Sequence, residues 1–229
     1  MNIPHLISLI SPYIYECKLN IDTKQRQHYW YYQLNSDYDY AAYKEEIFNE
    51  YYNSADDDLN FNAFAMKLQR YYCKNSNRAS EIEEIIDKID DKVIIFVRYL
   101  ESIPANAHKI TGAENQTERR NIISAFKSGE FDVLYMTYGC GAYGLNLQFC
   151  QNIIFAEQVW DYALQVQAEA RIYRMGQADE VHYYHLRCDS VGLEELMADC
   201  IAKKENLLDR MKVEIAKQKG GAKEWLKNI

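Results

Sequence analysis

The sequence lacks any apolar run that approaches the ~20 residues of a membrane helix, so it predicts no membrane-spanning segment. No basic stretch precedes its first apolar residues, and Pro4 and Pro12 interrupt them, so we expect no signal peptide and a cytoplasmic protein. Internal repeats and low-complexity tracts are also missing. With 48% hydrophobic and 26% charged residues, the composition excludes wholesale disorder, and 229 residues suffice for one large or two small domains.

The cysteines and histidines offer no recognisable metal site. None of the six cysteines forms a C-x-x-C pair, and we expect them to be reduced, buried small hydrophobes: Cys17, Cys73, Cys140, Cys150, Cys188 and Cys200. His182 and His185 lie in the apolar run VHYYHL, and two strand residues three apart point to opposite faces. We therefore predict two ordinary histidines and no bound metal.

Basic residues are in the minority. The formal net charge is −8, which excludes a broadly basic surface and restricts any nucleic-acid contact to a local patch. Residues 31–60 contain eight acidic residues and one lysine, whereas residues 201–229 contain eight basic and four acidic ones. The 20 tyrosines, together with many isoleucines, asparagines and lysines, suggest an AT-rich bacterial or phage genome.

The first 90 residues read as a mainly helical region. Apolar periodicity predicts helices over residues 22–34, 40–52, 59–73 and 75–90, a short strand at 13–19 and a loop at 53–58. From residue 91 the pattern changes to short, continuous β-branched runs that alternate with helical segments. Strands are expected at 91–97, 108–110, 131–137, 152–157 and 180–187, and helices at 116–129, 161–174 and 191–218.

This alternation predicts an α/β fold with a parallel sheet flanked by helices. The expected division is a mainly helical region over 1–90 and an α/β lobe over 91–229 that ends in one long amphipathic helix. Asn115 and Glu118 form a capping-box pattern at the start of the predicted helix 116–129, and Gly129 follows its end.

Gly139, Gly141 and Gly144 superficially match the dinucleotide-binding pattern G-x-G-x-x-G. Only LNLQFCQ separates Gly144 from the next strand, so no helix follows whose N-terminus would hold a pyrophosphate. We therefore reject that interpretation. Two alternatives stay open: a flexible turn, or a loop whose backbone approaches a ligand or a nucleic-acid phosphate closely.

The segment QAEARIYRMGQ gives the strongest functional signal. If it is helical, Gln167, Arg171 and Arg174 share one face, and a pair of guanidinium groups suits a polyanion such as a transferred phosphoryl group. The alternative is a solvated face, or ion pairs with Glu169 or Glu180.

This segment resembles motif VI of the SWI/SNF-type branch of superfamily 2 helicases, roughly QAxxRxxRxGQ. The matching positions are Gln167, Ala168, Arg171, Arg174, Gly176 and Gln177. The Gly-Gln ending differs from the HRxGRxGR of DEAD-box RNA helicases, which disfavours an RNA helicase lobe. Upstream, VLYMTYGCGAYGLNLQFCQNIIF is similar to motif V, KVIIF to motif IV, and EQVWDYALQVQ to the stretch before motif VI. The resemblance is strong over 92–204.

The resemblance implies the C-terminal, RecA-like motor lobe of an ATP-dependent double-stranded-DNA translocase. Arg174 would be the arginine finger, with Arg171 as a second catalytic residue. The implied ATP-binding residues are Gln167, Gly144, Asn146 and Glu157, and the implied DNA-backbone contacts are Thr111, Gly112, Thr137, Arg119 and Arg120.

The sequence departs from the family pattern in informative places. Gly139 stands where the family often has lysine, Ala142 replaces a glycine, and Glu157 replaces the usual aspartate. No GxxxxGK[ST] loop and no DEAH-like acid pair is present. ATP and Mg²⁺ are therefore expected only in a complete motor, this lobe alone is expected to be inactive, and its partners are an N-terminal lobe, in the same gene or in trans, and weakly bound duplex DNA. The alternative is a non-catalytic DNA- or partner-binding module with the same fold.

Overall fold

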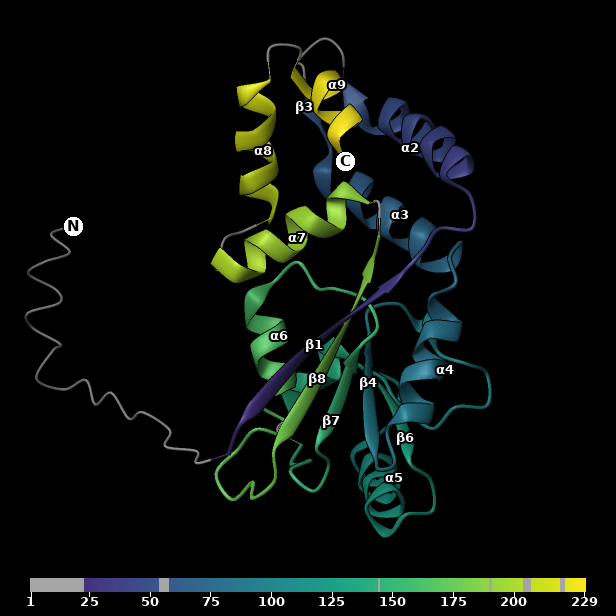
Figure 1. Cartoon of the computed structure of the whole chain (residues 1–229), viewed down its shortest axis with the longest axis vertical. Helices are drawn as coiled ribbons and strands as arrows, with labels where there is room; N and C mark the ends of the chain where they lie inside the picture. The colour runs from purple at the N-terminus through teal and green to yellow at the C-terminus, as the bar shows by residue number, and fades with distance from the viewer. Residues whose placement is uncertain (1–22, 54–57, 144, 190, 204–206, 219–220) are drawn as a thin grey trace, which may run out of the picture.

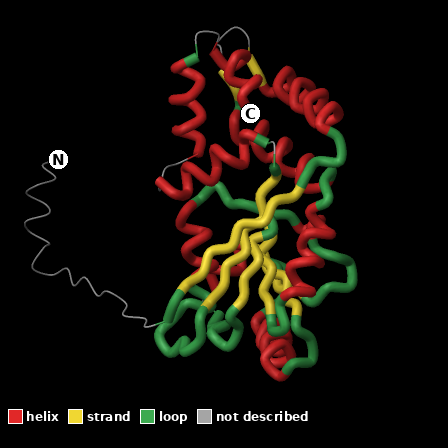
Figure 2. The backbone as a smooth tube through the Cα atoms, in the orientation of Figure 1, coloured by secondary structure: helices red, strands yellow, loops and turns green. Residues whose placement is uncertain are grey.

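The computed structural model describes residues 23–53, 58–143, 145–189, 191–203, 207–218 and 221–229. A sheet occupies the middle of the molecule, with helices beside it and beyond one end (Figures 1 and 2). Its strands are β1 (Gln25–Tyr32), β4 (Val93–Val97), β5 (Lys109–Ile110), β6 (Val133–Thr137), β7 (Asn152–Phe155) and β8 (Val181–Cys188). The helices are α2 (Asp37–Tyr51), α3 (Phe61–Lys74), α4 (Arg78–Lys88), α5 (Gln116–Ser128), α6 (Tyr162–Glu169), α7 (Gly192–Lys203), α8 (Leu207–Lys217) and α9 (Gly221–Trp225).

All six strands of the sheet are parallel, and their order is β1-β8-β7-β4-β6-β5. The predicted parallel α/β sheet is confirmed. β4 and β7 are buried along their whole length, as expected of a strand covered on both faces. Short 3-10 helices lie at Leu100–Ser102, Tyr138–Tyr143 and Leu226–Asn228.

The two faces of the sheet carry two separate cores. Val93, Ile95 and Val97 of β4 join the core that α2, α3 and α4 complete. Ile94 and Phe96 belong to the opposite core, which contains side chains of α5 and α6. Alternation along a strand sends neighbouring side chains to opposite faces, so a continuous apolar run can supply both cores. None of the helices within the described ranges combines the length and apolar character that a membrane crossing requires.

The helix predicted over residues 22–34 is wrong, because this segment forms the edge strand β1. Each of its residues pairs in parallel register with β8, from Gln25 opposite Val181 to Tyr32 opposite Cys188. Aromatic residues favour strands when a neighbouring strand is available to pack against. That neighbour lies about 156 residues away in the sequence, so local periodicity could not reveal the pairing.

The other helices before residue 90 are confirmed with small shifts of their ends. The expected loop at 53–58 is flanked by a short antiparallel pair, β2 (Tyr52–Asn53) and β3 (Asp58–Leu59). The strand expected at 13–19 lies outside the described residues. The predicted capping box is confirmed: the Asn115 side chain accepts from the Glu118 N–H, and the Glu118 carboxylate accepts from the Asn115 N–H. Gly129 ends α5 in the left-handed conformation, with φ of 80°.

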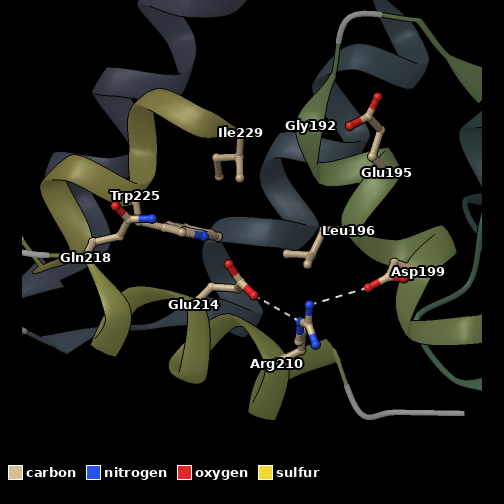
Figure 3. Close-up of a pocket in the computed structure, with 9 residues that line it drawn as sticks. All are labelled: Gly192, Glu195, Leu196, Asp199, Arg210, Glu214, Gln218, Trp225 and Ile229. Carbon is tan, nitrogen blue, oxygen red and sulfur yellow. Dashed lines mark ion pairs between the residues drawn. The ribbon is translucent and has the colours of Figure 1, made fainter. Parts of the chain in front are cut away.

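The single long C-terminal helix is also corrected, because the described residues of this region form α7, α8 and α9. Arg210 of α8 makes an ion pair with Asp199 of α7 at 3.5 Å (Figure 3). In one continuous helix, residues 11 apart would be separated by about 16 Å along the axis, which is beyond the reach of this pair. Arg210 also pairs with Glu214 at 3.1 Å, so it links the two helices.

A carboxyl group is buried in the core beside α3. Glu194 is 1% exposed, its Oε1 accepts from the Tyr72 hydroxyl at 2.7 Å, and its Oε2 has no partner among the described residues. Burial raises the pKa of Glu194 from 4.5 to about 7, against the opposing effects of the Tyr72 hydrogen bond and of Arg187.

This shift predicts a pH-dependent stability. Because the folded-state pKa lies above the unfolded value, the stabilisation is complete below pH 4.5 and is lost as the pH rises through 7. Glu194→Gln, which imitates the protonated carboxyl, is expected to be about 3 kcal/mol more stable than the wild type at pH 8 and similar to it at pH 4.5. Urea unfolding of both proteins across this range measures the difference, and parallel pH profiles would contradict the assignment.

Candidate functional site

The arginine-bearing segment after α6 is not helical as predicted. α6 ends at Glu169, and residues 170–177 form a series of turns. The Arg171 and Ile172 N–H groups donate to carbonyls three residues back rather than four. The expected row of Gln167, Arg171 and Arg174 on one helical face is therefore wrong.

Contacts distant in sequence explain why the helix ends early. The Leu147 N–H donates to the Arg171 carbonyl at 3.1 Å. The Gln177 amide is buried and donates to the carbonyls of Gln148 and Ile172, at 3.0 and 3.4 Å. These bonds use backbone groups that a continued helix would occupy, and Gly176 completes the turn with φ of 93°.

The two arginines of this segment have side chains that no described residue binds. Arg171 is 8% exposed, and its Nε is buried without a hydrogen-bond partner. Burial lowers the pKa of Arg171, and the nearby charge of Arg174 lowers it further. Arg174 is half-buried. Within the described part of the chain neither guanidinium forms an ion pair, so two nearby positive charges are left uncompensated, an arrangement that an anion would stabilise.

The other candidate ATP-binding residues differ in their exposure and in their hydrogen-bond partners. Gln167 is exposed on α6, and Asn146 is exposed with its Oδ1 accepting weakly from the Gln148 N–H. Gly144 lies outside the described residues. Glu157 is buried: its Oε1 pairs with Arg78 Nη1 at 2.6 Å, and its Oε2 accepts from the Arg98 N–H at 2.6 Å. The Glu157 carboxylate is thus already bound within the lobe.

The candidate DNA contacts fall into two groups. Gly112 and Arg120 are exposed, whereas Thr111 and Arg119 are buried. The Thr111 hydroxyl and N–H both donate to the Glu114 carboxylate, and Arg119 lies near the Thr111 carbonyl.

The Thr137 hydroxyl is half-buried at the end of β6 and contacts the Cys140 Sγ at 3.2 Å. The 3-10 helix Tyr138–Tyr143 follows directly. A Cβ added at Gly112 or Gly139 would meet nothing within 4 Å, so this chain itself does not require glycine at either position.

Two further arginines were not identified from the sequence. Arg98 directly follows β4, and its guanidinium lies 4.2 Å from the ring centre of Trp160. With Thr137 and Gly139 it lines a cavity of about 330 Å³. A basic residue immediately after a buried strand was the available signal. No sequence signal pointed to Arg78, because its partner Glu157 is 79 residues away.

The histidine pair His182 and His185 lies in β8. His182 contacts His28 on one face of β8, whereas His185 contacts Gln27 on the other, as the spacing predicts. Among the described residues no group of His, Cys, Asp or Glu is arranged to hold a metal ion. The described cysteines are free and buried, and Cys17 lies outside the described residues.

A cavity between α7, α8 and α9 has charged walls but carries no evidence of a ligand. It measures about 280 Å³, and Trp225 and Ile229 contribute to its lining (Figure 3). The charge of Arg210 is matched by Asp199 and Glu214. This cavity therefore marks the junction of the C-terminal helices.

Known proteins resemble this chain in both sequence and fold. The helicase conserved C-terminal domain matches residues 74–176. A probable global transactivator of Orgyia pseudotsugata multicapsid polyhedrosis virus is 30% identical over 132 residues, which are 52% of this chain and 26% of that protein. An uncharacterized ATP-dependent helicase, YqhH, of Bacillus subtilis is 28% identical over 146 residues, 59% of this chain and 26% of that protein. The chain thus spans about a quarter of the length of these relatives, which come from a virus and a bacterium and do not narrow its own source.

Two solved structures share the fold. The C-terminal part of the Fun30 ATPase domain superposes with a TM-score of 0.61 at 14% identity, over 79% of this chain and 89% of that one. The Sulfolobus solfataricus SWI2/SNF2 ATPase core in complex with double-stranded DNA gives 0.62 at 20% identity, over 87% and 50% of the two chains. The parallel sheet flanked by helices is the RecA-like fold of such cores. Residues 74–176 are therefore similar to the helicase conserved C-terminal domain, and the chain has the RecA-like fold of SWI2/SNF2-type ATPase cores.

Proposed function

We propose that this lobe forms one side of the ATP site of a double-stranded-DNA translocase, with Arg174 as arginine finger and Arg171 beside it. The observation that carries the proposal is the pair of uncompensated guanidiniums, one of them buried with an unpartnered Nε. Gln167 and Asn146 are exposed, and we assign them to the same nucleotide from the motif resemblance. An anion that binds from outside the lobe would compensate these two positive charges.

The chemistry expected of the two arginines is electrostatic. In phosphoryl transfer the charge spreads over the equatorial oxygens of the transferred group, and a guanidinium placed there stabilises it without forming a bond. The planar fork of arginine can bind two oxygens at once. Because the sequence contains no GxxxxGK[ST] loop, we assign Mg²⁺ and the cradle for the β- and γ-phosphates to a first motor lobe, in the same polypeptide or in a separate one.

The proposal predicts that the 229-residue chain alone shows no ATP turnover. A two-sided cleft with one side missing offers few contacts to nucleotide and no cradle for its phosphates. The chain fused to a first lobe that carries a Walker A loop should hydrolyse ATP, and duplex DNA should stimulate it. Phosphate release measures both, with the Walker A lysine of the added lobe replaced as the control. Turnover by the chain alone, or none by the fusion despite correct folding of both lobes, would contradict the proposal.

Duplex DNA binding is proposed from the fold, because the related SWI2/SNF2 core is described in complex with double-stranded DNA. We expect Gly112, Thr137 and Arg120 to contact the phosphate backbone, which positions a protein without reading sequence. Arg119 and Thr111 would support these contacts from their buried positions.

The expected binding by this chain is weak and strongly dependent on salt. The net charge of −8 opposes it, and each phosphate that is neutralised contributes about −0.9 to the slope of log K against log salt. Arg120→Gln should therefore reduce the slope by about 0.9. Gly112→Ala should weaken binding without altering the fold, since its Cβ meets only open space. Fluorescence anisotropy with a labelled duplex measures both effects, and tight, salt-independent or sequence-specific binding would exclude this mode.

A further inference from the structure

A second polar cavity lies on the α6 side of the sheet. It measures about 160 Å³ and is enclosed by β1, β8, α6, α7 and the loop after β7. The sheet contributes the stacked rings of Tyr29 and His185, whose centroids are 5.4 Å apart. α7 contributes the aliphatic side chains of Ala198, Ile201 and Ala202. The two rings and the α7 side chains form the apolar walls of the cavity.

Two lining residues carry buried polar atoms that no described residue binds. Gln158 is 6% exposed, and its Oε1 is buried without a partner in the described part of the chain. The Nε of Arg187 is buried and unpartnered in the same sense. A buried acceptor and a buried donor left unpaired are costly, so a ligand that pairs with both would stabilise the folded protein.

The remaining polar walls define the charges that a ligand meets. The Arg187 guanidinium lies 4.3 Å from the centre of the Tyr29 ring. The Glu169 carboxyl is held by the Gln165 amide at 3.0 Å, and burial raises its pKa. Burial and the neighbouring Arg187 lower the pKa of His185 to about 4, so this ring is neutral at pH 7. The cavity therefore combines one cationic donor with an amide and a carboxyl acceptor.

This site is distinct from the proposed ATP site. Gln165 and Glu169 are one turn apart and share a face of α6. Gln167 is two residues from each of them, about 200° around the helix, and it is exposed. A ligand held by Gln165 and Glu169 thus lies on the other side of α6 from Gln167.

We propose that this cavity binds a guanine ring. Guanine presents two acceptors, O6 and N7, to which an arginine donates two parallel hydrogen bonds. Its N1–H and N2–H₂ form a donor edge that complements the Gln158 Oε1 and the Glu169 carboxyl. Adenine carries a donor in place of O6, and therefore cannot accept both bonds from Arg187. In this proposal the ring lies between the sheet residues Tyr29 and His185 and the α7 side chains that line the cavity.

The ring could come from a free nucleoside or from an unstacked base of single-stranded nucleic acid, and the test separates these sources. The full chain, labelled with ¹³C at alanine methyls, is titrated with guanosine, adenosine, and two single-stranded oligonucleotides of dT, one of them with a central dG. We expect guanosine to shift the Ala198 and Ala202 methyls with a Kd of about 0.1 mM, at least about tenfold below that of adenosine. The Ala222 methyl, buried in another part of the molecule, is the internal control.

Gln158→Leu should weaken guanosine binding by about tenfold or more, and Gln116→Leu, at an exposed position of α5, should not change it. Shifts caused only by the dG oligonucleotide would assign the ring to nucleic acid, and shifts caused by guanosine would assign it to a nucleoside. Equal binding of adenosine, or no shift at Ala198 and Ala202 with either guanine source, would overturn the proposal. The wild-type titration decides this even if Gln158→Leu does not fold, and the outcome is independent of ATP turnover.

Discussion

In the complete motor, Arg174→Ala is expected to lower ATP turnover by roughly 10³-fold, at the low end of the range for arginine fingers supplied across an interface. The effect should fall on kcat, because the guanidinium acts mainly on charge that develops in the transition state. Duplex DNA affinity and the melting temperature should change little. The motor for this test is the fusion of the chain with a first lobe that carries a Walker A loop.

The structure favours this result over a structural role for Arg174. The acidic partners weighed from the sequence are Glu169, Asp179 and Glu180. In the described residues the Glu169 carboxyl accepts from Gln165, the Asp179 carboxyl from Gln151, and the Glu180 carboxyl from Arg26. Arg174 has no ion pair there, so its removal breaks no ion pair among these residues.

Three variants make the test decisive. Arg174→Lys should not restore turnover, because an ammonium group cannot reproduce the planar fork. Arg171→Ala should raise the KM for ATP as well as lower kcat, since Arg171 is expected to contact the nucleotide in the ground state too. Arg26→Ala removes an exposed arginine of β1 that pairs with Glu180, and it should leave ATP turnover nearly unchanged. A lower melting temperature with near-normal turnover in Arg174→Ala would refute the arginine-finger assignment.

Much of the fold follows from local sequence, and the exceptions share a physical cause. β4, β6 and β7 are continuous β-branched or aromatic runs, and the ends of α5 are encoded by Asn115, Glu118 and Gly129 within one segment. β1 was predicted as a helix because its pairing depends on β8. The early end of α6 depends on Leu147 and Gln177, and the separation of α7 from α8 on the Asp199–Arg210 pair.

Some residues of the candidate site could likewise be predicted from local sequence, and others could not. The arginine pair could be found because its residues are three apart within one motif. The polar atoms of Gln158 and Arg187 could not be found, because β1, β8 and the loop after β7 come together only in the folded sheet. The pairing of Glu157 with Arg78 could not be predicted for the same reason. Because of this pairing, we expect Glu157 to contribute to the stability of the lobe.

Arg78 and Glu157 form a buried ion pair that joins three elements. Their side chains are 7% and 0% exposed. Arg78, the first residue of α4, also donates to the Cys73 carbonyl at 3.1 Å and to the Ser102 hydroxyl at 3.0 Å. Glu157 follows β7 and accepts from the Arg98 N–H at the end of β4. Removal of one partner leaves a charge buried without compensation, which costs more than the pair contributes.

Arg78→Met is therefore expected to lower the free energy of unfolding by about 3–5 kcal/mol, and Glu157→Gln by a similar amount. The double variant should be more stable than the sum of the two losses predicts, because neither charge is then left unpaired. Urea unfolding of the four proteins measures the coupling. Glu84→Gln, which breaks the exposed Glu84–Lys88 pair, is the control and should cost about 0.5 kcal/mol or less. If Glu157→Gln instead unfolds like the wild type but weakens ATP binding in the complete motor, the carboxylate acts in the nucleotide cleft and the ion pair is incidental.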